Sequence, residues 1–352
     1  MKRLVALLLC LCLVAGFAAC SSGKSAETTT AAASTAAAAA ETTAAAKKNL
    51  TFGYVVNDMS HEWYQNIVKG AQSRAAELGI TLKVADAAMD VGKQVTQIEN
   101  LLTEGVNVQI ITPVDVKALS SVMKEASDAK IPVISESNVI EGAKTYVGID
   151  NKSGGMKAGK WFAEYAKKNN IDPKILIVGL PAFADCRMRV EGFKAALDES
   201  GLKYEIVQEV DGQGSKETSL KVSQDAITAH PEVNVIFGIN DNSTTGAMAA
   251  YKEAGLDEGK LTAIGFGFEG NVGREALLSG GPYKAAVAMF PDFVGVNLID
   301  AAVMAANGEA LPENYESGTV VITQDNFADF YTKEGDGYKT NFDAIRALLK
   351  KG

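Results

Sequence analysis

The strongest constraint on the fold is an alternation of short apolar runs with amphipathic segments, which continues from Leu50 to Ile322. The apolar runs are nearly continuous, which is typical of strands buried on both faces of a parallel sheet. Strands that alternate with helices predict α/β/α layers. Because the pattern starts afresh at Lys152, the sequence predicts an α/β protein with two domains, each with a parallel sheet between layers of helices.

Residues that end or begin helices, such as Gly79, Gly105 and Asp90, place the predicted elements along the chain. We expect strands at 50–56, 80–85, 108–112, 131–135, 146–149, 175–179, 205–209, 233–238, 261–266, 284–288 and 319–322. We expect helices at 62–78, 90–105, 114–129, 152–168, 188–200, 216–229, 244–254, 274–278 and 295–307. A last amphipathic segment surrounds Phe342, Ile345 and Leu348, and the sequence suggests no function for it.

Ligands of open parallel sheets bind beyond the carboxyl ends of the strands, so residues that follow strands are the candidates for a site.

The N-terminus has the features of an export signal. Lys2 and Arg3 precede an apolar run that is too short to span a bilayer comfortably, and small residues follow it. Cys20 stands after two alanines, as in the bacterial lipobox, so we expect residues 1–19 to be a lipoprotein signal peptide and Cys20 to be lipidated. A secreted protein cut after Ala19 is the alternative. Residues 20–48 are rich in Ala, Thr and Ser and predict a disordered tether.

Charge and composition exclude several classes of function. The chain has 34 basic and 43 acidic residues and no basic cluster, which argues against nucleic acid as a partner. Beyond Cys20 the body keeps one cysteine, Cys186, so an intrachain disulfide is not expected there and a packing role is favoured. The only histidines are His61 and His230, and the sequence predicts neither a metal site nor a cofactor.

The residues that follow the predicted strands combine aromatic rings, amides, carboxylates and a guanidinium. A sugar needs this mixture, because its C–H face packs on an aromatic ring while its hydroxyls need donors and acceptors. The candidate ligand-binding residues are Asn57, His61, Trp63, Tyr64, Ser137, Asn138, Arg187, Asn240, Glu269 and Met289.

The order of several short motifs resembles the type I periplasmic binding proteins of ABC importers, and within them the ribose-binding group. The matching pieces are Trp63-Tyr64, Lys69-Gly70-Ala71, Asp150-Asn151, Gly154-Gly155, Ala158-Gly159, Arg187-Met188-Arg189, Glu191-Gly192-Phe193, Thr228-Ala229-His230-Pro231, Asn240-Asp241 and Pro291-Asp292. The resemblance implies that Asn57, His61, Trp63 and Tyr64 line the first lobe's side of a cleft. It also implies that Arg187 and Asn240 project from the second lobe, and that Met289 lies at a hinge crossing. By the same resemblance, we expect two Rossmann-like lobes whose parallel sheets are joined by a three-stranded hinge, with crossings near Asp150, Met289 and Ile322. The first lobe is expected to comprise 49–150 plus 290–321, and the second 151–289 plus 322–352.

Departures from the ribose-binding group bear on the ligand. Ser137-Asn138 stands in place of an Asp-Arg pair, and Met289 replaces a glutamine. Glu269 replaces an aspartate if Gly267 to Gly270 is the matching stretch, although Gly265-Phe266-Gly267 competes by a shift of two residues. A different monosaccharide, a polyol or a cyclitol therefore fits better than ribose. Glu62, Glu136 and Glu269 leave room for a ligand that carries an amine.

Two glycine-rich strings resemble nucleotide-binding motifs and are interpreted otherwise. Gly265 to Gly270 has dinucleotide-fingerprint spacing, but it puts an acid where a pyrophosphate needs backbone N–H groups. Gly154 to Lys160 matches the phosphate-loop spacing until Trp161, which stands where a Ser or Thr is required. We expect the second string to be the small face of a packed helix.

The export signal predicts an extracytoplasmic lipoprotein. The resemblance implies that it is a monomer and no enzyme, and that it captures a monosaccharide or related polyol and delivers it to the permease subunits of an ABC importer in the membrane. One alternative is a ligand-sensing module that feeds a membrane receptor. Another is a non-sugar polar ligand such as a cyclitol, an amino sugar or a signalling furanose. A transcription regulator of related fold would need a DNA-binding headpiece, whereas this chain carries an export signal.

Overall fold

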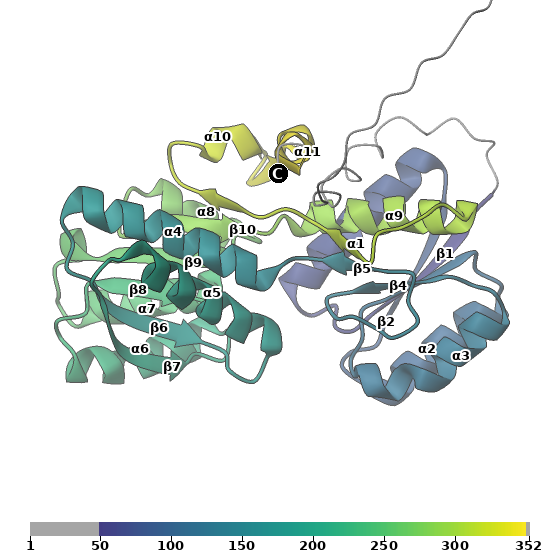
Figure 1. Cartoon of the computed structure of the whole chain (residues 1–352), viewed down its shortest axis with the longest axis horizontal. Helices are drawn as coiled ribbons and strands as arrows, with labels where there is room; N and C mark the ends of the chain where they lie inside the picture. Colours follow the sequence, from purple (N-terminus) through teal and green to yellow (C-terminus); the bar gives the residue numbers. More distant parts are fainter. Residues whose placement is uncertain (1–48, 350–352) are drawn as a thin grey trace, which may run out of the picture. The chain divides into compact units, whose positions relative to one another are not determined.

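The computed structural model describes residues 49–349 (Figure 1). The predicted signal peptide, the lipidation site Cys20 and the tether lie outside the described residues. Two six-stranded sheets and one two-stranded sheet make up the described part, and helices cover both faces of each large sheet. The predicted α/β fold with two lobes is confirmed.

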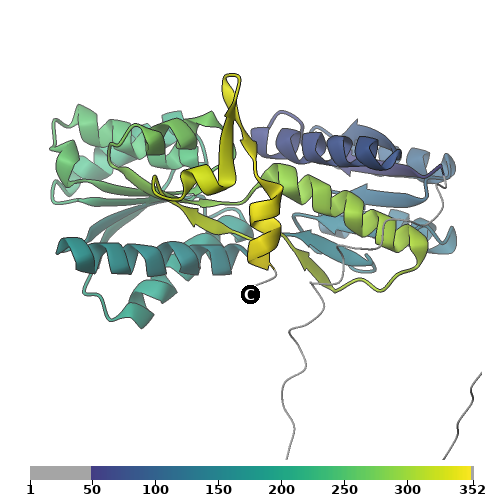
Figure 2. The ribbon, with the colours of Figure 1, turned by 90° about the horizontal axis from the view of Figure 1, so that it is seen from above.

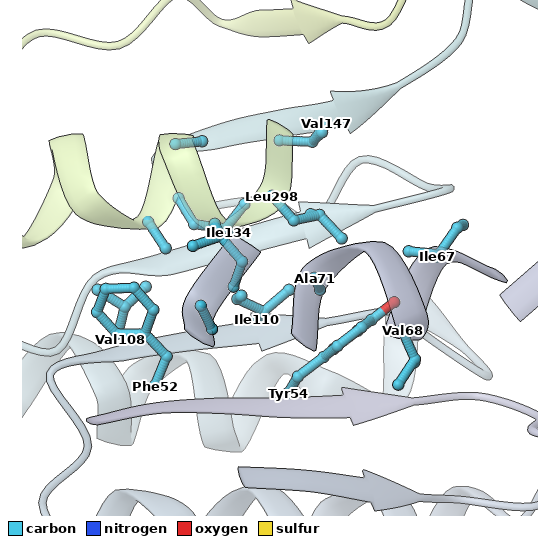
Figure 3. Close-up of a cluster of buried hydrophobic side chains, with 14 of the residues drawn as sticks. Phe52, Tyr54, Ile67, Val68, Ala71, Val108, Ile110, Ile134, Val147 and Leu298 are labelled. Carbon is cyan, nitrogen blue, oxygen red and sulfur yellow. The ribbon is translucent and has the colours of Figure 1, made fainter. Parts of the chain in front are cut away.

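The first sheet is entirely parallel, in the order β11-β5-β4-β3-β1-β2. Its strands are β1 (Thr51–Val56), β2 (Thr81–Asp86), β3 (Val108–Ile111), β4 (Val133–Glu136), β5 (Thr145–Gly148) and β11 (Asn314–Glu316). Helices α1 (Glu62–Leu78) and α9 (Pro291–Asn307) cover one face, and Figure 3 shows Ile67, Ala71 and Leu298 directed at the strands. Helices α2 (Val91–Thr103) and α3 (Ser120–Asp128), with the short η1 (Val116–Leu119), cover the other face.

The second sheet repeats this layout in the order β12-β10-β9-β8-β6-β7, with β12 antiparallel to β10. Its strands are β6 (Lys174–Gly179), β7 (Glu205–Asp211), β8 (Val235–Gly238), β9 (Thr262–Gly267), β10 (Tyr283–Ala288) and β12 (Val320–Ile322). Its helices are α4 (Asn151–Asn169) and α5 (Ala184–Ser200) on one face and α6 (Lys216–Ala229) and α7 (Asp241–Glu253) on the other, with η2 (Glu258–Lys260) and α8 (Asn271–Leu278) in the connections.

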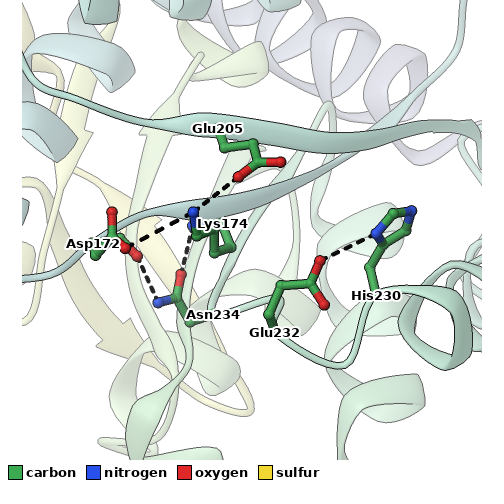
Figure 4. Close-up of polar contacts among 6 residues, drawn as sticks. All are labelled: Asp172, Lys174, Glu205, His230, Glu232 and Asn234. Atoms are coloured by element: carbon green, nitrogen blue, oxygen red, sulfur yellow. Dashed lines mark hydrogen bonds and ion pairs between the residues drawn. The ribbon is translucent and has the colours of Figure 1, made fainter.

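Exposed charges gather at the amino ends of the second sheet's strands, opposite the edge where a site is expected. Lys174 contacts Glu205 at 2.8 Å, Asn234 accepts a hydrogen bond from the Lys174 backbone, and His230 contacts Glu232 at 3.2 Å (Figure 4). Solvent-exposed pairs of this kind contribute little stability. One of the two histidines is thereby placed away from the carboxyl edges.

The chain crosses three times between the sheets. The crossings lead from β5 to α4, from β10 to α9, and from β11 to β12. The third crossing lies at residues 317–319 and not near Ile322, because Ser317 still bonds Gly148 of the first sheet while β12 already pairs with β10. The predicted position of this crossing was therefore a few residues too late.

The C-terminal segment forms a separate layer over the second crossing. It contains α10 (Phe327–Phe330), the hairpin β13 (Tyr331–Glu334) with β14 (Gly337–Thr340), and α11 (Phe342–Leu349), drawn in yellow in Figure 2. Its aromatic residues share an apolar cluster with Phe290 and Phe293, and the buried Ile345 confirms the amphipathic character of the last helix.

Close backbone contacts fix two helix pairs. A Cβ atom on Gly192 of α5 would lie 2.1 Å from the Lys152 carbonyl oxygen, and one on Gly70 of α1 would lie 2.0 Å from the Asp292 carbonyl oxygen. Gly155 and Gly159 face the α5 backbone in the same way. The string from Gly154 to Lys160 is thus the small face of a packed helix, as expected.

None of the helices between residues 49 and 349 combines the length and the apolar character needed to cross a bilayer. Within the same residues, no group of three or more His, Cys, Asp or Glu side chains is arranged to hold a metal ion. The remaining cysteine of this part, Cys186, is free and buried.

Candidate functional site

A buried carboxyl group, Glu136, lies at the carboxyl edge of the first sheet. Its two oxygens accept hydrogen bonds from the Thr112 hydroxyl at 2.7 Å and from the Ser137 hydroxyl at 2.6 Å. The Tyr54 hydroxyl lies 3.0 Å from Thr112 and extends the network. Burial raises the Glu136 pKa to about 7, although the two hydroxyl bonds oppose this shift. The network holds the carboxyl group in place with neutral partners.

Asn57 and Tyr64 lie beside this network. Asn57 follows β1, its side chain is 7 % exposed, and its Oδ1 has no hydrogen-bond donor among the described residues. The Tyr64 hydroxyl lies within reach of the Asn57 and Ser137 side chains, and burial together with the Glu136 charge raises its pKa to about 12. Asn57, Tyr64 and Ser137, three of the predicted site residues, are therefore brought together, whereas Asn138 is exposed.

The start of α1 presents the other predicted residues of this half. His61 caps the helix, since its Nδ1 accepts a hydrogen bond from the Trp63 backbone at 3.2 Å, and its ring meets Tyr64 edge-on at 6.0 Å. Partial burial lowers the His61 pKa, which favours the neutral ring. Trp63 packs against the apolar clusters of both sheets, so its ring lies where the two halves of the molecule approach.

On the second sheet's side, α5 carries Arg189 in addition to the predicted Arg187. Arg189 Nε donates to Asn151 Oδ1 at 2.8 Å, Nη1 donates to the Ile239 carbonyl at 2.8 Å, and the guanidinium lies 4.6 Å from the centre of the Phe266 ring. Arg187 is exposed and donates to the Pro181 carbonyl at 2.6 Å. Residues 187 and 189 point in different directions because both lie within α5.

This difference follows from where α5 begins. The sequence predicts a start at Met188, which would leave Arg187 in a loop, but the helix begins at Ala184. Phe183 occupies the cap position without a capping side chain, so the usual sequence signal for a helix start is missing. Asp185 and Arg189, spaced four residues apart, then share one face of the helix.

The loop after β9 brings Glu269 into the same region. Glu269 directly follows the turn at Gly267 and Phe268, and Arg189 and Arg274 moderate the effect of burial, which raises the Glu269 pKa to about 7. Asn66 of α1 donates to the Glu269 carbonyl at 3.1 Å, and a Cβ atom on Gly270 would lie 2.4 Å from a Glu62 carboxylate oxygen. The stretch from Gly267 to Gly270 thus stands at the carboxyl edge of the sheet.

Arg274 supports this loop from behind. It is 8 % exposed, its Nη2 donates to the carbonyls of Phe268 at 3.2 Å and Glu269 at 3.4 Å, and its guanidinium lies 4.6 Å from the centre of the Tyr331 ring. Tyr331 belongs to the C-terminal layer. This layer therefore packs against the arginine that holds the Glu269 loop.

Two predicted residues have structural partners. Asn240 caps α7 through Oδ1, which accepts from the Ser243 backbone at 2.7 Å, while its Nδ2 donates to the Gly214 carbonyl at 2.9 Å. Met289 is 1 % exposed and lies in the apolar cluster of the second sheet. Ligand contact by these two side chains stays a prediction, as it does for Arg187.

The site also contains acids that the list of predicted residues omits. Glu136 ends an apolar strand, and Asp185 lies in the first turn of α5. The Asp185 charge raises the pKa values of both Glu136 and Tyr64, so the two sheets bring acids close together. Both acids lie at or beyond the carboxyl end of a strand, and this position was the sequence signal that could have identified them. The Thr112 hydroxyl that bonds Glu136, and the Asp185 charge that raises its pKa, are distant from it in sequence.

Comparison with known proteins gives consistent matches. The model of the periplasmic binding protein domain matches residues 52–310. The chain is 28 % identical over 268 residues to the ribose import binding protein of Salmonella typhimurium. The aligned region covers 75 % of this chain and 88 % of that protein.

Solved structures agree with these matches. A periplasmic solute binding protein of an ABC transporter from Actinobacillus succinogenes, with bound D-allose, is 26 % identical with a TM-score of 0.71 and covers 80 % of this chain and 100 % of its own. A myo-inositol binding protein from Caulobacter, bound to myo-inositol, is 26 % identical with a TM-score of 0.67 and covers 80 % of this chain and 96 % of its own.

Proposed function

Because this chain belongs to the periplasmic binding protein domain family, we propose that it captures a monosaccharide or related polyol and delivers it to the permease of an ABC importer. Proteins of this family bind substrates for ABC transporters and are not enzymes. The similar proteins named above bind ribose, D-allose and myo-inositol by their names or titles, which supports a hydroxyl-rich ligand for this chain.

The single observation that carries the proposal is the convergence of aromatic and polar side chains at the carboxyl edges of both sheets. Trp63 and Tyr64 offer apolar ring faces to the C–H side of a sugar. Asn57, Glu136 and Glu269 offer acceptors to its hydroxyl groups. A ligand that contacts both edges favours the arrangement in which they face each other, because those contacts exist only there.

The finer details of location also belong to the proposal. Lipidation of Cys20 would anchor the protein outside the cytoplasm, and residues 20–48 would let a monomeric binding domain reach the permease. Replacement of Cys20 by serine should release the protein from the membrane fraction. Retention of that variant in membranes would contradict the anchor.

A screen of ligands by thermal shift tests the binding function. The purified protein is heated with pentoses, hexoses, polyols and cyclitols, and a ligand at 100 times its dissociation constant should stabilise the native state by about 2.7 kcal/mol. Calorimetry then measures the affinity and a stoichiometry of one. The absence of binding by every hydroxylated compound would refute the proposal.

A further inference from the structure

Between residues 49 and 349, no lysine or arginine forms an ion pair with the acids around the Tyr64 hydroxyl. Glu136 and Asn57 approach it from the first sheet, and Asp185 approaches from α5 of the second. The Glu136 carboxyl group receives hydrogen bonds from the Thr112 and Ser137 hydroxyls and from the Ser137 backbone N–H, and none of these donors carries a charge. Asp185, the charged neighbour that acts most on it, is another acid.

The nearby arginines form hydrogen bonds with other groups. Arg189 uses Nε and Nη1 on the Asn151 amide and the Ile239 carbonyl, and Arg274 uses Nη2 on two backbone carbonyls. Arg187 is exposed and bonded to the Pro181 carbonyl. Each arginine therefore donates hydrogen bonds to neutral acceptors. The Arg189 charge does lower the pKa values of Asp185 and Glu269, against the effect of burial.

Asn57 gives an independent indication that a donor is missing. It is 7 % exposed, and its Oδ1 has no donor among the described residues. A buried acceptor without a donor costs about 1–3 kcal/mol, so native proteins usually satisfy one with a protein group, an ordered water or a ligand. The Asn57 side chain lies in the same group as Glu136, Ser137 and Tyr64.

Resting on the function proposed above, we propose that the ligand carries a protonated amine beside its hydroxyl groups, and that Glu136, Asp185 and Asn57 Oδ1 receive it. An ammonium group has three donors and one positive charge, which matches one neutral acceptor and two carboxylates. Burial raises the pKa values of Glu136 and Asp185, and a bound cation would counter that cost of ionisation. Amino sugars and aminocyclitols share this chemistry.

Matched pairs of compounds test the proposal by calorimetry at pH 7. Each pair consists of an amino compound and the compound with a hydroxyl in its place: glucosamine with glucose, galactosamine with galactose, and an aminodeoxyinositol with the corresponding inositol. We expect at least one amino compound to bind ten times more tightly than its hydroxyl partner or better. The pair that shows this preference separates an amino sugar from an aminocyclitol.

Variants identify the acids that receive the amine. Glu136→Gln and Asp185→Asn should each reduce the ratio of amine to hydroxyl affinity at least fivefold. The exposed Glu104, which pairs with Lys83 at 2.5 Å, provides the control, and Glu104→Gln should leave the ratio unchanged. A ratio that is unaffected by the two site variants would overturn the assignment even if the amine is preferred.

The outcomes separate this inference from the proposed function. Tight binding of hydroxyl compounds with no preference for an amine would overturn the inference and leave the proposed function intact. Binding of neither member of any pair, and of none of the wider set of sugars and polyols, would refute both.

Discussion

At the carboxyl edges of the two sheets, the charged side chains have different kinds of hydrogen-bond partner. At the first sheet, Glu136 is held by the hydroxyls of Thr112 and Ser137, and its negative charge has no arginine bonded to it. At the second sheet, Arg189 and Arg274 are held by backbone carbonyls. The first edge thus carries positioned acceptors, whereas the second carries arginines bonded to the backbone beside the acids Asp185 and Glu269. The first edge therefore has acceptors to which a ligand can donate hydrogen bonds.

The scaffolds beneath these edges are alike. Each lobe has a helix pair in which glycines allow the backbones to touch: α1 with α9 in the first and α4 with α5 in the second. The chemical contrast therefore arises at the ends of the strands and not in the packing below them.

The largest expected effect tests this shared scaffold. Gly192→Ala places a Cβ atom 2.1 Å from the Lys152 carbonyl oxygen and should lower the free energy of unfolding by about 3 kcal/mol, because backbone must move. Gly70→Ala should act similarly in the first lobe. Gly179→Ala, with its nearest atom at 3.7 Å, is the control and should change little in urea unfolding. If one of the two glycine variants keeps the wild-type free energy of unfolding while the other does not, the scaffolds of the two lobes differ.

The pH dependence of stability tests the isolated acid of the first edge. The Glu136 pKa is about 7 in the folded protein against 4.5 for an ordinary glutamate, so the native state keeps this proton to higher pH. Its contribution is therefore fully present below about pH 4.5 and is lost as the pH rises through about 7, by roughly 3 kcal/mol at most.

Glu136→Gln should remove this part of the pH dependence in urea unfolding measured from pH 4.5 to 8. Asp241 and Glu269 also have pKa values of about 7, so some slope will remain. The surface variant Glu104→Gln should keep the wild-type slope. An unchanged slope in Glu136→Gln would mean that the carboxyl group is not held as described.

The two arginines of α5 allow a sharper test of the second edge. Arg189→Ala leaves Asn151 Oδ1 and the Ile239 carbonyl without their donors and should lower the free energy of unfolding by about 2 kcal/mol. Arg187→Ala removes an exposed side chain and should change it by about 0.5 kcal/mol or less. Greater loss of stability from Arg187→Ala would reverse the assignment of the two positions.

The smallest effect is spectroscopic and concerns the point where the edges approach. The chain has two tryptophans, and Trp161 stacks on Tyr165 with ring centres 5.0 Å apart. In a Trp161→Phe variant, Trp63 emission should change when a sugar or polyol binds, because its ring packs against both apolar clusters. Emission that stays constant during saturable binding would exclude Trp63 from the contact.

Local signals in the sequence were sufficient for much of the fold. Helices α1 and α6 have the predicted bounds because Gly79 ends one and Ser215 caps the other. The start of α5 was missed because Phe183 offers no cap, and the short edge strand β11 was missed because three residues carry little periodicity.

The site was harder to predict than the fold, for a physical reason. Position after a strand identified Asn57, Tyr64 and Ser137, which lie together. Glu136 acquires its character from Thr112, which is 24 residues away, and Arg189 acquires its position from Asn151 and Ile239. Such partners come together only through tertiary packing, which the local sequence pattern does not predict.

The account stands on one claim, that a single hydroxylated ligand contacts both edges at once. Calorimetry with whichever compound the screen identifies tests it most directly, using Asn57→Ala for the first edge and Glu269→Gln for the second. The account predicts one site per chain and an affinity at least tenfold lower in each variant. An affinity that either variant leaves at the wild-type value would contradict it.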